Sequence, residues 1–190
     1  ERLLEQVLHT PLMTAATGGQ TLAQLPKARR MDELEFYFWV DRLRLPALQR
    51  VLREHLPVEW TAIHAAIERL KFPLLTGYMK GFIDLIFEAD GQYYIVDYKS
   101  NELGATAADY AFDAMQQAMA EHHYYLQYLI YSVALQRYLR LRLADYAWET
   151  HVGGVLYLFL RGMQPSVAGS GVFFHKPDAA LIDALDQVMG

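Results

Sequence analysis

Apolar residues gather into two short runs, residues 82–87 and 93–98, on either side of a turn-forming segment at 89–91. Two such runs joined by a short connection containing Asp-Gly predict a β-hairpin with a tight turn. Each run nevertheless contains one aspartate, and a lysine follows the second run. Charges in apolar strands cost free energy unless they are paired or bind a metal, so this hairpin is the first place to look for function.

The remaining pattern predicts helices alternating with strands. The hairpin aside, strands are expected at 31–40 ("MDELEFYFWV") and in the continuous apolar run 151–162 ("HVGGVLYLFLRG"). Helical spacing predicts helices over 1–13, 46–54, 57–70 with Pro57 in the first turn, 107–142 as two helices joined near Glu121-His122, and 177–189. Residues 14–30, with Gly18-Gly19 and Pro26, are expected to be irregular. This order indicates an α/β fold with a central mixed sheet flanked by helices.

Composition narrows the class of protein. The chain has 190 residues, 53% of them hydrophobic, which suits one domain with a sizeable core. No apolar run approaches the roughly 18 residues of a membrane span. The absence of cysteine excludes disulfides, thiolate zinc sites and cysteine-ligated iron–sulfur clusters, and favours a cytoplasmic protein. Because the first helical segment starts without a cap, we expect a fragment of a longer chain.

The net charge of −5 is not that of a protein that coats DNA. A polyanionic ligand would need a local basic patch or a bound metal. Two basic clusters are present, and we interpret both as solvated faces: Lys27, Arg29, Arg30 and Arg137, Arg140, Arg142.

The hairpin charges predict a metal site. Side chains alternate along a strand, so Asp97 and Lys99 share one face, and Asp84 lies close to Asp97 if the register is suitable. Two carboxylates with room for water are the oxygen ligands that magnesium prefers. The alternative is a surface ion pair of Asp97 with Lys99 and an unrelated Asp84. Gln127 and Tyr131, four residues apart on a predicted helix, lie on one helix face.

Three other features favour structural roles. His122 and His123 are adjacent on a helical stretch and point about 100° apart, which does not suit a shared metal. The tyrosines at 93, 94, 124, 125 and 128 are interpreted mainly as packing residues, although unpaired bases could stack on them. Gly153-Gly154 lacks the Lys and Ser/Thr of a phosphate-binding P-loop. The sequence therefore predicts no ATP site in this chain.

Five segments in this order resemble the PD-(D/E)xK nucleases, and among them the C-terminal nuclease domain of RecB-type proteins: "ELEFYF", "KGFIDLIF", "YYIVDYKSN", "YYLQYLIYSVALQRYLR" and "GGVLYLFLRG". The resemblance covers nearly the whole chain. It implies a restriction-endonuclease-like fold and a single nuclease domain over 1–190, cut at its N-terminus from a larger helicase–nuclease. The implied activity is magnesium-dependent hydrolysis of DNA phosphodiesters, of the exodeoxyribonuclease V type.

The resemblance also implies roles for the hairpin residues. Asp84 matches the first metal-binding aspartate, Asp97 the second, and Lys99 the motif lysine. The backbone carbonyl of Tyr98 is implied as a further metal ligand. Magnesium is the implied cofactor, with calcium or manganese able to substitute in binding.

Residues outside the hairpin complete the implied site. Glu33 matches an active-site glutamate, with Glu35 the less favoured choice, and Gln127 and Tyr131 match a QxxxY element. The family's metal-binding histidine belongs to a helix upstream, and His9 does not fit its pattern. We therefore expect the fragment to cleave DNA only weakly.

The implied partners are DNA ends and the RecC and RecD subunits, with RecA as a further candidate and no membrane. Two alternative functions stay open. One is a catalytically silent DNA-binding or docking module of the same fold, which retention of costly charges disfavours. The other is a stand-alone restriction or repair endonuclease, which the RecB-like flanking segments disfavour.

Overall fold

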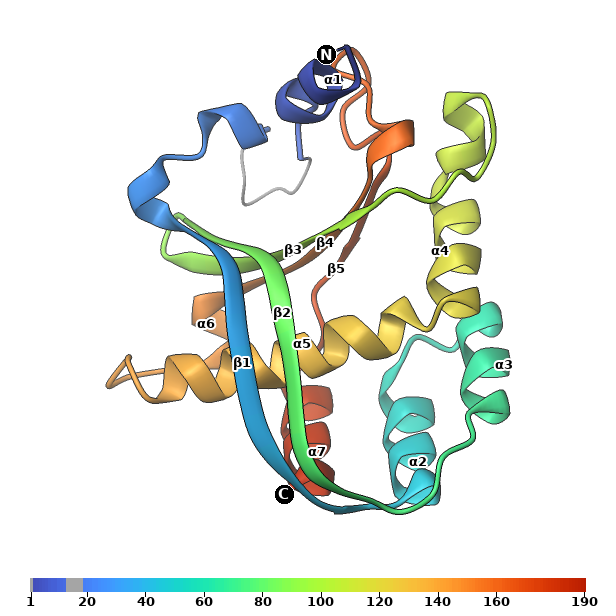
Figure 1. Cartoon of the computed structure of the whole chain (residues 1–190), viewed down its shortest axis with the longest axis vertical. Helices are drawn as coiled ribbons and strands as arrows, with labels where there is room; N and C mark the ends of the chain where they lie inside the picture. The colour runs from blue at the N-terminus through green and yellow to red at the C-terminus, as the bar shows by residue number, and fades with distance from the viewer. Residues whose placement is uncertain (1, 13–18) are drawn as a thin grey trace.

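The strands of the protein form one mixed sheet in the spatial order β1-β2-β3-β4-β5 (Figure 1). The computed structural model describes residues 2–12 and 19–190. Its strands are β1 (Arg30–Leu43), β2 (Leu75–Ala89), β3 (Gln92–Lys99), β4 (Val152–Phe159) and β5 (Val172–His175). The β3–β4 pair is parallel and the other neighbouring pairs are antiparallel. The predicted α/β fold with a mixed central sheet is confirmed.

Helices and short turns cover both faces of this sheet. The helices are α1 (Arg2–His9), α2 (Leu45–His55), α3 (Thr61–Arg69), α4 (Phe112–Glu121), α5 (Tyr124–Arg140), α6 (Trp148–His151) and α7 (Ala179–Met189). The 3₁₀ turns are η1 (Leu22–Gln24), η2 (Lys27–Arg29), η3 (Ala107–Tyr110) and η4 (Leu160–Gly162). The larger core lies between the sheet and helices α2 to α5 and α7. A smaller core lies under α1 and η1 on the opposite face.

Alternation along β3 divides its side chains between these two cores. Tyr94 and Val96 pack into the smaller core beneath α1, whereas Ile95 packs into the larger core. Asp97 follows on the same side as Ile95, and this side faces α5. The strand period thus directs the second aspartate of the hairpin toward the long helix.

The predicted hairpin is confirmed, and its first strand is longer than expected. Its turn consists of Asp90 and Gly91, both with positive φ, as a two-residue hairpin turn requires. β2 begins at Leu75 rather than near residue 82 and pairs with β1 throughout, so the two strands form a long ribbon. Gly81 interrupts the apolar pattern of β2 because a Cβ there would lie 2.6 Å from the Phe36 ring.

Two other boundaries differ from the prediction. α3 begins at Thr61 rather than at Pro57, because residues 57–60 form a turn in which the Trp60 N–H donates to the Pro57 carbonyl at 3.0 Å. The strand β5 has no predicted counterpart, since four residues are too few to show a period. The break between α4 and α5 falls at His122-His123, close to the predicted position. Residues 1 and 13–18, including Gly18 of the predicted irregular segment, lie outside the described residues.

The second basic cluster is only partly a solvated face. Arg137 Nε lies 2.6 Å from Asp186 Oδ1, and Arg140 contacts both Asp183 and Asp186 of α7. The expectation of a solvated face is therefore wrong for Arg137, which is half-buried, whereas Arg140 stays exposed while it pairs with α7. The ion pairs of Arg137 and Arg140 link α7 to α5. The Arg142 guanidinium instead stacks on the Tyr138 ring at 3.6 Å.

We expect Gly153→Ala to lower the free energy of unfolding by about 1–3 kcal/mol, because the added methyl group would overlap the buried Tyr94 ring. Denaturant unfolding measures the change. As a control, Gly153→Ala should cost less in a Tyr94→Leu background than in the wild type. Equal costs in the two backgrounds would contradict this explanation.

Candidate active site

The two hairpin aspartates lie where β2 and β3 separate. Pairing of these strands ends at Leu85–Val96, so Asp84 and Asp97 occupy the next opposed position. Beyond it, β2 continues along β1 while β3 continues along β4, which leaves a fork in the sheet (Figure 1). The Tyr98 backbone N–H donates to Asp84 Oδ2 at 3.0 Å across this fork. The fold thus brings the two carboxylates together at an opening of the sheet.

Asp97 and Lys99 form a buried ion pair beside Asp84. Lys99 Nζ lies 2.5 Å from Asp97 Oδ1, and the two residues are only 8% and 2% exposed. Burial raises the pKa of the Asp97 carboxyl, and the nearby Asp84 carboxylate raises it further, whereas the adjacent ammonium of Lys99 lowers it. Burial is the larger effect, so the Asp97 carboxylate is stabilised incompletely by Lys99 alone.

Helix α5 completes the polar surroundings of Lys99. Lys99 Nζ donates to Gln127 Oε1 at 2.9 Å, and Gln127 Nε2 donates to the Tyr131 hydroxyl at 2.8 Å. The spacing of four residues places Gln127 and Tyr131 one above the other on the helix face toward the sheet. Burial raises the pKa of Tyr131 to about 12, and the charge of Asp97 adds to this effect. Tyr131 therefore stays protonated at neutral pH.

Two tyrosines that the sequence did not single out as site residues also surround Lys99. The ammonium lies 3.9 Å from the ring centroid of Tyr124 and 4.9 Å from that of Tyr157. The Tyr157 hydroxyl donates to Gln127 Oε1 at 3.1 Å. Tyr157 lies beside Asp97 in the β3–β4 register. In the sequence, its hydroxyl within an otherwise apolar, buried strand is the feature that could have indicated a site residue. Together the two rings and Gln127 fix the position of the lysine.

The two candidate glutamates on β1 have different positions. Glu33 falls between the Asp32–Leu85 and Leu34–Ile83 pairs, level with Asp84, and has a left-handed backbone with φ of 54°. This conformation costs a non-glycine residue about 1 kcal/mol or more and is often found at functional sites. Glu35 instead forms an exposed ion pair with Lys80 at 2.5 Å. The position of Glu33 is compatible with its predicted role, which stays a prediction.

The donor set at the fork fits a hard divalent cation. Asp97 Oδ1 is buried and meets no donor at hydrogen-bonding geometry, despite its closeness to the Lys99 ammonium. Among the residues that the structure describes, no group of three His, Asp or Glu side chains gathers to hold a metal. The two carboxylates would therefore rely on the Tyr98 carbonyl and water for the other positions around a cation. His122 and His123 are exposed at the junction of α4 and α5.

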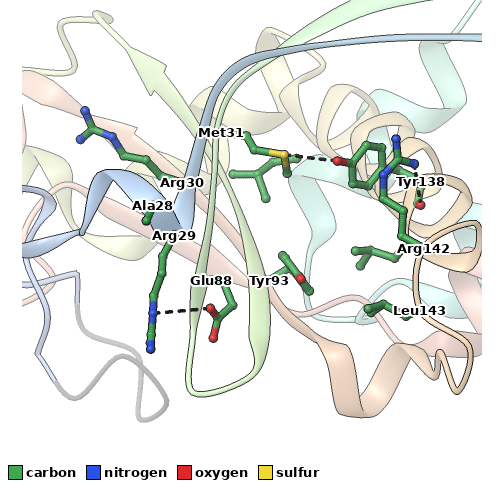
Figure 2. A pocket seen from close by; sticks show the side chains of 11 residues that line it. Ala28, Arg29, Arg30, Met31, Glu88, Tyr93, Tyr138, Arg142 and Leu143 are labelled. Atoms are coloured by element: carbon green, nitrogen blue, oxygen red, sulfur yellow. Dashed lines mark hydrogen bonds and ion pairs between the residues drawn. The ribbon is translucent and has the colours of Figure 1, made fainter.

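A separate pocket of about 210 Å³ lies between the hairpin and the C-terminal part of α5 (Figure 2). Its arginines are engaged within the protein: Arg29 is 3.7 Å from Glu88, and the guanidinium of Arg142 covers the ring of Tyr138. None of the predicted site residues lines this pocket. It therefore does not belong to the candidate active site.

The forked mixed sheet carries two acids and a lysine at its opening, and the chain belongs to the PD-(D/E)XK nuclease superfamily. The sequence model of that superfamily matches residues 2–188. The predicted family is thereby confirmed. Within the described part of the chain, no helix is both long and apolar enough to cross a membrane.

The chain is similar to one segment of the RecBCD enzyme subunit RecB from several bacteria. It is 41% identical to the Escherichia coli protein over 183 residues, which cover 96% of this chain and 15% of that protein. The match to the Haemophilus influenzae protein is 41% over 186 residues, covering 97% of this chain and 14% of that protein. The match to the Mycobacterium tuberculosis protein is 40% over 208 residues, covering 99% of this chain and 19% of that protein. The chain thus spans under a fifth of the length of these relatives.

We expect Tyr157→Phe to reduce nuclease turnover on the order of tenfold. Gln127 Oε1 accepts hydrogen bonds from Tyr157 and from Lys99, and loss of the first leaves the side chain of Gln127 less firmly oriented. Phenylalanine keeps the ring beside the ammonium, so the melting temperature should change little. Rates of DNA cleavage at saturating metal and DNA measure the effect.

Tyr128→Phe is the matched control. The Tyr128 hydroxyl is buried on the same helix as Gln127 and has no hydrogen-bond partner among the described residues. Its removal should leave turnover unchanged. Equal turnover of the two variants would show that the Tyr157 hydroxyl does not position Gln127.

Proposed function

We propose that this chain is a magnesium-dependent DNA nuclease domain of a RecBCD-type helicase–nuclease, with activity of the exodeoxyribonuclease V type. The observation that carries the proposal is the buried Asp97–Lys99 pair beside Asp84 at the fork of the sheet. A silent module of the same fold would have no use for such a pair, because burying two charges costs several kcal/mol unless further bonds compensate. The intact contacts to Gln127 therefore favour catalysis.

Magnesium, held by Asp84, Asp97 and the Tyr98 carbonyl, would supply Lewis-acid assistance to the attack of water on a phosphodiester. Lys99 is placed to orient that water or to stabilise negative charge on the phosphoryl group. Gln127 accepts a hydrogen bond from the ammonium, and the rings of Tyr124 and Tyr157 restrict the movement of that ammonium. These contacts let Lys99 act without large reorganisation.

The proposed substrate is DNA at double-strand breaks, processed for recombinational repair. An acidic chain neutralises few phosphates, so we propose that other parts of the assembly deliver the DNA. RecC and RecD are the proposed partner subunits, because the relatives are RecBCD subunits. RecA is a further proposed partner, and the lack of cysteine suits the proposed cytoplasmic location.

Magnesium or calcium should raise the melting temperature of the wild-type chain, because a cation between Asp84 and Asp97 relieves their repulsion. Asp84→Asn should lose most of this shift. Asp90→Asn removes an acid from the turn of the same hairpin, and this variant should keep the full shift in melting temperature. Equal shifts for wild type and Asp84→Asn, measured by thermal melting with each cation, would rule out a metal site at the fork.

In a RecBCD-type assembly that carries this domain, Asp97→Ala or Lys99→Ala should reduce DNA degradation by about a hundredfold or more, because each removes half of the buried pair. DNA unwinding should persist, since this chain shows no P-loop. The control is Lys71→Ala, which removes an exposed lysine. Normal degradation by either site variant would refute the proposed function.

A further inference from the structure

A groove of about 320 Å³ adjoins the candidate active site, between the β1–β2 ribbon and the N-terminal half of α5. Phe36, Met79, Leu126 and Ile130 give it apolar walls. Gln127 and Tyr131, which belong to the lysine network described above, line it as well. The groove is therefore continuous with the active site. Lys80 and His123 line the groove too, and an apolar lining with a few polar groups is usual for a site that binds a small organic group.

The β2 side of this groove is an unpaired strand edge. Past Leu85, β2 pairs with β1 only, because β3 has separated from it. Alternate residues on such an edge direct their N–H and C=O groups away from the neighbouring strand. Within the described residues, the backbones of Met79, Lys80 and Gly81 make no hydrogen bond outside the β1 ladder. The groove thus offers hydrogen-bonding groups along one side and apolar side chains around them.

We propose that this groove holds a nucleobase of an unpaired DNA strand next to the scissile phosphate. The inference rests on the proposed nuclease function and adds the place at which a base of the substrate is held. A base has an apolar face, which suits Met79 and Leu126, and a hydrogen-bonding edge, which suits the free edge of β2. Gly81 is three residues before Asp84, about 10 Å along the strand, so a base here keeps its neighbouring phosphate near the carboxylates.

A peptide strand added to the edge of β2 is the competing occupant. Such a strand would run beside Gln127 and Tyr131 and would restrict the approach of a phosphate to Asp84 and Asp97. A nucleotide instead uses both parts of the continuous surface, the groove for its base and the fork for its phosphate. A base within a duplex cannot enter the groove without being unpaired. The geometry therefore favours an unpaired nucleotide.

The test compares two short fluorescent oligonucleotides, one with bases and one in which abasic deoxyribose replaces every nucleotide. Binding is measured by fluorescence anisotropy with calcium in place of magnesium to limit cleavage. Met79→Trp fills the groove from β2, and Leu126→Trp fills it from α5. Tyr78→Trp is the matched control, since Tyr78 is the neighbouring residue of β2, is 65% exposed and does not line the groove. Thermal melting identifies any variant that does not fold.

We expect the wild-type chain to bind the base-bearing strand on the order of tenfold more tightly than the abasic strand. Either folded groove variant should lose this preference while binding the abasic strand as before, and Tyr78→Trp should keep it. Equal binding of both strands by the wild type would overturn the proposal and point to another occupant, such as a peptide strand. A preference that survives both filling substitutions would overturn it too. A chain that degrades DNA yet fails this test retains its nuclease function without the base site.

Discussion

The buried pair of Lys99 and Asp97 is the constraint around which the site is arranged. Both charges are almost fully removed from water, and an ion pair in such surroundings is tolerated only with good geometry and further hydrogen bonds. Gln127 supplies one such bond, and Tyr157 in turn orients Gln127. Helix α5 must therefore dock in one position across the sheet. The contacts of Arg137 and Arg140 with α7 anchor the far end of that helix.

The same arrangement leaves the acids short of stabilisation. Asp97 keeps a raised pKa despite its lysine partner, and one of its oxygens meets no hydrogen-bond donor. Glu33, level with Asp84, holds a strained backbone. A fold optimised for stability alone would avoid each of these features, and departures of this kind concentrate at functional sites. A divalent cation bound by the two aspartates, as proposed above, would supply part of this missing stabilisation and would link metal binding to stability.

Access to the site follows from the topology of the sheet. Between Leu85 and the hairpin turn, β2 pairs with β3. On the other side of Leu85, β2 pairs with β1 alone, and β3 pairs with β4 alone. The fork created by this divergence leaves Asp84 and the buried Asp97 at an opening of the sheet, and the free edge of β2 forms one side of the groove. Had β3 continued along β2, Asp84 and Asp97 would lie inside a closed sheet. The position at which the two strands part therefore decides that the acids lie at an opening of the sheet.

Local patterns in the sequence determined the hairpin, the sharing of one face by Asp97 and Lys99, and the placement of Gln127 above Tyr131, because strand and helix periods depend on neighbouring residues only. The resemblance of five segments to the PD-(D/E)xK nucleases was likewise readable from the chain. Tertiary structure alone decided that Asp84 faces Asp97 at a fork, that Tyr157 orients Gln127, and that Arg137 binds α7. It also decided the extent of β2, where glycines hide the period, and the existence of β5. These features depend on register and on contacts between distant segments, and the spacing of residues along a chain does not encode which distant partner each one meets.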